Sequence, residues 1–212
     1  MRIEVYSDVA CPWCYIGERR LTRALEQRPD LHVERVWRPF QLQPDLPPSG
    51  LPWDEYAAAK FGGAERARAM FARVTEVAAG DGLEYHFERI PTAANTMDAH
   101  RLILFAREYG KEWAMAEALF AAYFTHGADL ADRDQLVAIA TGSGLPEDAA
   151  RAYLASDAGV AEVAASQEEA AALGIGGVPF YIFDGRYAVS GAQPVALFLR
   201  ALDLASQDAK AS

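Results

Sequence analysis

Cysteine and histidine are scarce in this sequence, and their scarcity excludes the common structural metal sites. Only two of the 212 residues are cysteines, too few for a four-cysteine zinc site. A Cys2His2 site would need histidines at finger-like spacings, and none of the four stands at such a spacing (His32, His86, His100 and His126). We therefore expect no metal centre.

Positive charge and long apolar runs are also lacking. The chain has 3 lysines and 17 arginines against 30 acidic residues, a formal net charge of −10. That balance argues against nucleic acid as a partner, because phosphate backbones would be repelled. No run of 18 apolar residues exists, so we expect no membrane span. The first fourteen residues lack the apolar stretch of a secretory signal. A cytoplasmic location is expected if Met1 is the native start, and a signal removed from the chain is the alternative.

Both cysteines lie in one tetrapeptide, Cys11-Pro12-Trp13-Cys14. A predicted strand over 2–6 precedes it, and a run with helical spacing over 12–27 follows. A CxxC between a strand and a helix start is typical of a thioredoxin-like redox site, since the free N–H groups of a helix N-terminus stabilise a thiolate. In a reducing cytosol such a pair is catalytic or redox-sensing rather than structural. The alternative of two buried structural thiols leaves this setting unexplained.

The order of predicted elements indicates one domain interrupted by helices. A βαβ unit comes first, followed by a proline-rich loop over 39–52, a series of helices, a β-hairpin turning at Asp184-Gly185, and a last helix over 194–205. The predicted strands are 2–6, 32–37, 180–183 and 186–190. The predicted helices between them are 12–27, 53–61, 64–80, 95–109, 111–125, 132–141, 146–155 and 157–173. We predict an α/β, thioredoxin-like fold in which 1–52 and 174–212 form one domain and 53–173 is an all-helical insertion.

Four segments, taken together and in order, carry a family resemblance. They read SDVACPWCYIG over 7–17, NTMDAHRL over 95–102, GIGGVP over 174–179 and VSGAQ over 189–193. The chain thereby resembles the DsbA family of thiol–disulfide oxidoreductases, within the thioredoxin superfamily, and its FrnE-like branch in particular. The resemblance implies a thioredoxin fold with a helical insertion and dithiol–disulfide oxidoreductase activity through the CPWC site.

The resemblance also implies roles for individual residues. Cys11 corresponds to the attacking thiol and Cys14 to the resolving thiol. Pro179 matches the family's cis-proline, which lies across from the CxxC and helps to hold the substrate backbone, and Val178 would face the dithiol. Most X–Pro bonds are trans, so the cis geometry is expected from the resemblance alone. The expected substrate-binding residues are Pro12, Trp13, Val178 and Pro179.

Two features of the CxxC segment predict its chemistry. Cys11 stands ahead of the helix and Cys14 one turn inside it, so Cys11 is expected to be the more exposed and more acidic thiol. Trp13 occupies the position where the strong periplasmic oxidants of the family carry histidine. An indole cannot carry a positive charge, so we expect a weaker oxidant.

A second function on the same fold is the principal alternative. Kappa-class glutathione transferases and hydroxychromene carboxylate isomerases contain a segment similar to 95–102. At the position of the CxxC, however, their motif typically lacks the second thiol and activates glutathione. Both thiols are present here, which favours redox exchange with a disulfide-bearing protein or a small-molecule thiol. We expect no bound cofactor, with glutathione as a possible thiol co-substrate. A third hypothesis is a non-enzymatic protein that binds peptides in its groove.

Three further polar residues have two interpretations each. Asn95 and His100 either line a small-molecule pocket between the insertion and the thioredoxin part or cap and pack a helix, for which Asn95 is a suitable residue type. Asp8 either tunes the thiols or caps the loop before the CxxC.

Overall fold

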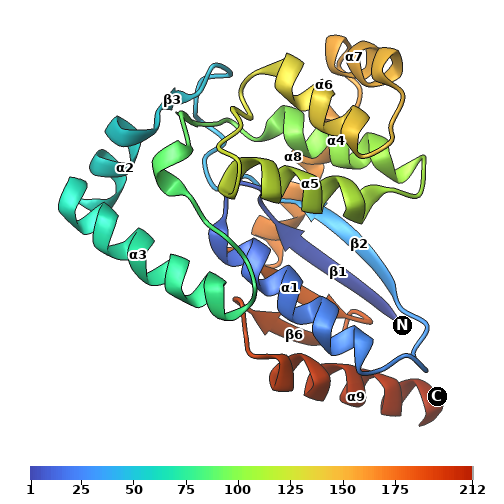
Figure 1. Ribbon diagram of the computed structural model, residues 1–212. Coiled ribbons are helices and arrows are strands. Elements are labelled where there is room, and N and C mark those ends of the chain that lie inside the picture. The colour runs from blue at the N-terminus through green and yellow to red at the C-terminus, as the bar shows by residue number, and fades with distance from the viewer. Residues whose placement is uncertain (212) are drawn as a thin grey trace.

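A four-stranded mixed sheet forms the centre of the fold. The computed structural model describes residues 1–211, and its main sheet has the strand order β2-β1-β5-β6. These strands are β1 (Arg2–Ser7), β2 (Glu34–Pro39), β5 (Phe180–Phe183) and β6 (Tyr187–Ser190). The first two pair in parallel, whereas β5 pairs antiparallel with both β1 and β6. The two ends of the chain therefore share one sheet, as the sequence predicted (Figure 1).

Helices cover both faces of this sheet. They are α1 (Pro12–Glu26) and α9 (Val195–Ala211) on one face and α8 (Val160–Ala172) on the other. Successive side chains of a strand point to opposite faces. Val5 accordingly packs in one core with Phe198 of α9, while its neighbour Tyr6 packs in another with Ala170 of α8. Because α1 follows β1 after a short turn and packs on the same sheet, its N-terminus lies close to the end of β1.

The remaining helices lie between β2 and α8 in sequence. They are α2 (Trp53–Phe61), α3 (Ala64–Gly80), the short 3-10 helix η1 (Phe87–Arg89), α4 (Met97–Arg107), α5 (Glu112–Phe124), α6 (Arg133–Gly142) and α7 (Glu147–Ala155). Helices α4 to α7 pack together above the sheet, and the α2–α3 pair stands to one side (Figure 1). Their core is continuous with both cysteines and Trp37. No helix within residues 1–211 is long and apolar enough to cross a bilayer.

The structure corrects the sequence prediction at two strands. β2 begins two residues later than expected and continues to Pro39. A proline is tolerated there because β2 is an edge strand, where the missing backbone N–H interrupts no hydrogen bonding to a further strand. The loop over 39–52 ends in a two-residue strand, β3 (Leu51–Pro52), which pairs with β4 (Thr92–Ala93). That pairing joins distant segments, so no local pattern indicated it.

Candidate active site

The CxxC segment turns from β1 into the first turn of α1. Cys11 is the N-cap residue and Pro12 opens the helix, where its missing N–H costs nothing. The Cys11 N–H donates to the Asp8 carbonyl at 3.0 Å, and the Cys14 N–H donates to the Cys11 carbonyl at 3.0 Å. No side chain caps this end of the helix. Both cysteines are free thiols, placed at the positive end of the helix dipole as predicted.

The loop before β5 approaches the thiols from the far end of the chain. The Val178–Pro179 peptide bond is cis, and the Cys11 Sγ lies 3.7 Å from the Val178 carbonyl oxygen. This confirms the predicted proximity of the 178–179 segment to the CxxC. It also limits exposure: Cys11 is 4% exposed and Cys14 1%. Cys11 is therefore the more exposed of the two thiols, as predicted, but the difference is small because the loop before β5 covers Cys11 as well.

Gly17 allows this approach. A Cβ on Gly17 would lie 2.2 Å from the hydroxyl oxygen of Tyr181 and 3.1 Å from Cγ of Pro179. Tyr181 is fully buried, so it has little room to move away. Helix α1 can therefore pack this closely on β5 only because residue 17 has no side chain.

Burial changes the acidity of the Cys14 thiol. It raises the pKa of the Cys14 thiol well above its ordinary value, and the neighbouring Cys11 thiol adds to the shift. Ser7 and the Asp8 backbone act in the opposite direction but do not offset it. Cys14 therefore stays protonated at neutral pH, as suits a thiol that attacks second.

We expect an alkylating reagent to modify Cys11 before Cys14. A raised pKa keeps Cys14 in the unreactive thiol form, so its labelling should grow only as pH rises beyond the range in which an ordinary thiol titrates, about 8.5. Peptide mass spectrometry after timed iodoacetamide treatment between about pH 6 and 10 measures both rates. Equal labelling of the two cysteines at neutral pH would contradict this order.

Asp8 lies beside the CxxC, with His100 behind it. The Asp8 carboxylate accepts hydrogen bonds from the N–H groups of Leu42 at 2.8 Å and Ala10 at 3.2 Å. The indole N–H of Trp37 donates to Nδ1 of His100 at 3.2 Å. The His100 ring therefore carries its proton on Nε2, which faces Oδ1 of Asp8 at 3.4 Å without completing a hydrogen bond. Asp8 lines the cavity next to Cys11, whereas His100 is enclosed behind it.

Asn95 fastens a loop and does not line that cavity. Its amide oxygen accepts hydrogen bonds from Gln41 at 2.9 Å and from the Met97 N–H at 3.1 Å. Its amide nitrogen donates to the carbonyl oxygens of Leu46 at 2.6 Å and Pro44 at 3.3 Å. These contacts fit the structural interpretation, but Asn95 also lines a separate cavity between the 41–48 loop and the inserted helices, so both interpretations stay open.

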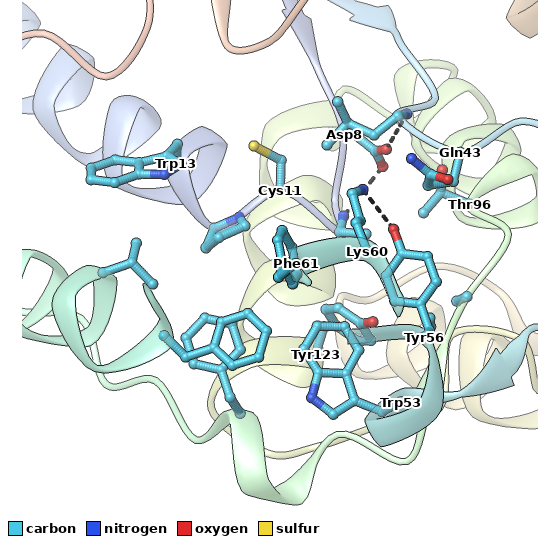
Figure 2. A pocket seen from close by; sticks show the side chains of 18 of the residues that line it. Asp8, Cys11, Trp13, Gln43, Trp53, Tyr56, Lys60, Phe61, Thr96 and Tyr123 are labelled. Atoms are coloured by element: carbon cyan, nitrogen blue, oxygen red, sulfur yellow. Dashed lines mark hydrogen bonds between the residues drawn. The ribbon is translucent and has the colours of Figure 1, made fainter. Parts of the chain in front are cut away.

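A cavity of about 330 Å³ opens beside Cys11. Figure 2 shows its position between the CxxC and helices α2 and α3, with the thiol of Cys11 at one wall. The wall opposite the thiol is mostly aromatic, and it includes Trp53, Tyr56, Phe61, Phe71, Phe87 and Tyr123. The sequence did not indicate these residues as part of the site, because their helical spacing is also that of an ordinary core.

The sequence pattern of the DSBA-like thioredoxin domain matches residues 2–203. The chain belongs to this family. A probable DsbA oxidoreductase of Streptomyces coelicolor is 38% identical, with a TM-score of 0.90 over 98% of this chain and 90% of that one. The predicted family and fold are confirmed; the FrnE-like branch stays a prediction.

Two structures of lower sequence identity share the fold. A 2-hydroxychromene-2-carboxylate isomerase has a TM-score of 0.72 at 15% identity, with all of both chains covered. The cytosolic disulfide reductase DsbM of Pseudomonas aeruginosa, in a structure with glutathione, has a TM-score of 0.67 at 20% identity over 98% of this chain and all of that one. At these identities the likeness shows the fold alone, which a disulfide reductase and an isomerase share.

Proposed function

We propose that this DsbA-like protein exchanges dithiols and disulfides through Cys11 and Cys14. One observation carries the proposal: two free thiols lie at the N-terminus of α1, with the first within 3.7 Å of the Val178 carbonyl. A nucleophile, a resolving thiol and a backbone segment that can hold a substrate thus meet at one point. Exchange requires all three, whereas glutathione binding without redox cycling requires only the first and last.

In the reducing direction, the reaction needs only the two thiols of the protein and the disulfide of the substrate. The Cys11 thiolate attacks one sulfur of a substrate disulfide, which breaks the S–S bond, forms a mixed disulfide and releases the first substrate thiolate. Cys14 then loses its proton and attacks the Cys11 sulfur. The second substrate thiolate leaves, and the protein holds a Cys11–Cys14 disulfide. The substrate is reduced and the protein oxidised; the reverse sequence forms a disulfide in the substrate.

Four residues are proposed to hold the substrate around this chemistry. Val178 and Pro179 would align the backbone or chain on either side of the reacting sulfur, because the Val178 carbonyl faces the Cys11 Sγ. Pro12 and Trp13 line the cavity beside Cys11, and Trp13 is 40% exposed at its edge. Such an exposed indole offers an apolar surface to an incoming disulfide.

Glutathione is proposed as a thiol co-substrate and not as a resident cofactor. The fold is shared with DsbM, whose structure contains glutathione and which is a cytosolic reductase. A cytoplasmic location and the same class of partner are proposed here on that likeness. The second candidate function, a glutathione-dependent isomerase or transferase, would leave Cys11 and Cys14 uncycled. A reversible Cys11–Cys14 disulfide at physiological potentials distinguishes the two.

The redox potential should be moderate, roughly between −270 and −120 mV. A dithiol oxidises strongly when its thiolate is over-stabilised, and Trp13 contributes no positive charge. Trp13→His should make the potential more positive, on the order of 30 mV for each 1.4 kcal/mol by which it stabilises the thiolate. Trp13→Phe is the matched control and should leave the potential near that of the wild type. Equilibration with reduced and oxidised glutathione measures all three.

A wild-type potential at the oxidising extreme, or an unchanged potential in Trp13→His, would contradict this account of the tuning. Failure to form any Cys11–Cys14 disulfide across the range would instead contradict the proposed function.

A further inference from the structure

The cavity beside Cys11 has the size of a small ring system. Its volume is about 330 Å³, whereas an engineered cavity of about 150 Å³ is enough to bind benzene. Two fused rings therefore fit. The cavity is also small for a ligand pocket, a class that spans about 300–1,000 Å³. An extended peptide would have to place a single side chain in it.

The cavity wall offers flat aromatic faces. Trp53 stacks on Phe71 with ring centroids 5.4 Å apart, and Phe71 stacks on Phe87 at 4.4 Å. Trp53 and Phe87 are themselves close to parallel, with 12° between their planes. Aromatic pairs gain free energy beyond the area that they bury, so such a wall favours a ring over a linear chain.

One cation faces this apolar space. Lys60, at the end of α2, lines the cavity, and its ammonium donates to the Tyr56 hydroxyl at 2.6 Å (Figure 2). It also lies over the rings of Tyr56 and Phe61, at 5.2 and 5.9 Å from their centroids. Among the side chains that the structure describes, no carboxylate forms an ion pair with it. An ammonium has three donors, so two remain for a ligand.

The carboxylate of the cavity does not neutralise that cation. Asp8 already accepts the N–H groups of Leu42 and Ala10, and the protonated nitrogen of His100 faces it. The two N–H groups of Leu42 and Ala10 stabilise its charge, and it forms no ion pair with Lys60. The protein as a whole carries −10, so attraction of an anion must come from Lys60 locally and not from the overall field.

We propose that the cavity binds the aromatic body of a small carboxylate-bearing thiol or disulfide, with its carboxylate at Lys60 and its sulfur at Cys11. The inference rests on the proposed function, since it names the substrate class of the same site. It makes an aromatic side chain within a peptide the weaker occupant, because no aromatic amino-acid side chain carries a carboxylate for Lys60.

The test measures how far non-reactive probes protect Cys11 from iodoacetamide in the dithiol protein. The first probe is 2-naphthoate and the second is 2-naphthamide, which has the same rings and no charge. In the wild type, 2-naphthoate should give half-protection at a concentration about two- to fivefold lower, as expected of one partly exposed ion pair. N-acetyltryptophanamide, which represents a peptide side chain, should protect less than either.

Variants assign the preference to Lys60. Lys60→Met should make the two naphthalene probes equal, and Lys60→Arg should keep the difference. Arg66→Met is the matched control, because Arg66 is an exposed cation on the neighbouring helix α3 that does not line the cavity. It should leave the wild-type preference unchanged.

The inference would be overturned by equal protection by both naphthalene probes in the wild type, by no effect of Lys60→Met, or by stronger protection by N-acetyltryptophanamide. Absence of protection by any probe would overturn it as well. Alkylation needs no disulfide cycle, so these outcomes are independent of whether Cys11 and Cys14 form a reversible disulfide. The proposed function and this inference can therefore fail separately.

Discussion

Cys11→Ser should reduce disulfide exchange to the background rate, a loss of roughly 10³-fold or more. A serine hydroxyl is not a nucleophile toward a disulfide at neutral pH, and Cys14 cannot take over. Cys14 is the more enclosed thiol, and burial raises its pKa, so little thiolate is present there. Turnover of an aromatic disulfide with excess dithiothreitol, followed by the absorbance of the released thiolate, measures the loss.

Cys14→Ser is the matched partner of that variant and should behave differently. Its Cys11 still attacks, but no second thiol releases the product, so the variant should accumulate the mixed disulfide. Intact-protein mass spectrometry should show the added mass of one substrate half, which dithiothreitol removes. Residual turnover in Cys11→Ser, or a mixed disulfide on Cys14 in the wild type, would reverse the assigned roles. Near-UV circular dichroism checks that both variants stay folded.

Arg101→Met should lower the free energy of unfolding by about 3–5 kcal/mol. The Arg101 side chain is 2% exposed and pairs with Asp98 at 2.6 Å. Its remaining donors bond backbone carbonyl oxygens at the junction of α7 and α8, namely those of Tyr153, Leu154, Ser156 and Ala158. A methionine fills similar space but brings no donor to these carbonyls. Tyr153 keeps its bonds from the Ser156 N–H and hydroxyl, whereas the Ser156 and Ala158 carbonyls lose the Arg101 donors, which is the costly outcome.

Arg133→Met is the control for that variant. Arg133 bonds the same Asp98 carboxylate at 2.7 Å, but its side chain is 59% exposed. An exposed ion pair contributes about 0–1 kcal/mol, so this variant should unfold near the wild-type midpoint. Urea unfolding followed by far-UV circular dichroism compares the three proteins. A midpoint for Arg101→Met as close to the wild type as that of Arg133→Met would show that the junction does not depend on Arg101.

The 95–102 segment shows how far a resemblance reaches. It correctly indicated the family, but it did not say what its polar residues do. In the structure Asn95 holds the 41–46 loop, His100 lies between Trp37 and Asp8, and Arg101 fastens the α7–α8 junction. None of the three lines the cavity of Cys11. Their partners lie far away in sequence, so the motif alone left their roles open.

The sequence by itself determined most of the elements and the place of the two thiols at a helix start. Local periodicity and turn residues predicted each α-helix between β2 and β5 and the hairpin at Asp184-Gly185, because these signals act within a few residues, but they did not predict the short 3-10 helix η1. The placement of Cys11 ahead of a helix and Cys14 inside it was likewise a local matter. The family resemblance added the approach of the 178–179 segment.

Only the tertiary structure decided what surrounds the thiols. It placed α8 on the sheet, put Gly17 against Tyr181, and brought α2 and α3 over Cys11 to enclose a cavity with Lys60 at its wall. Each of these contacts joins residues that are distant in sequence. Side-chain periodicity states that a residue faces a core, but which surface covers it follows from the packing of whole elements.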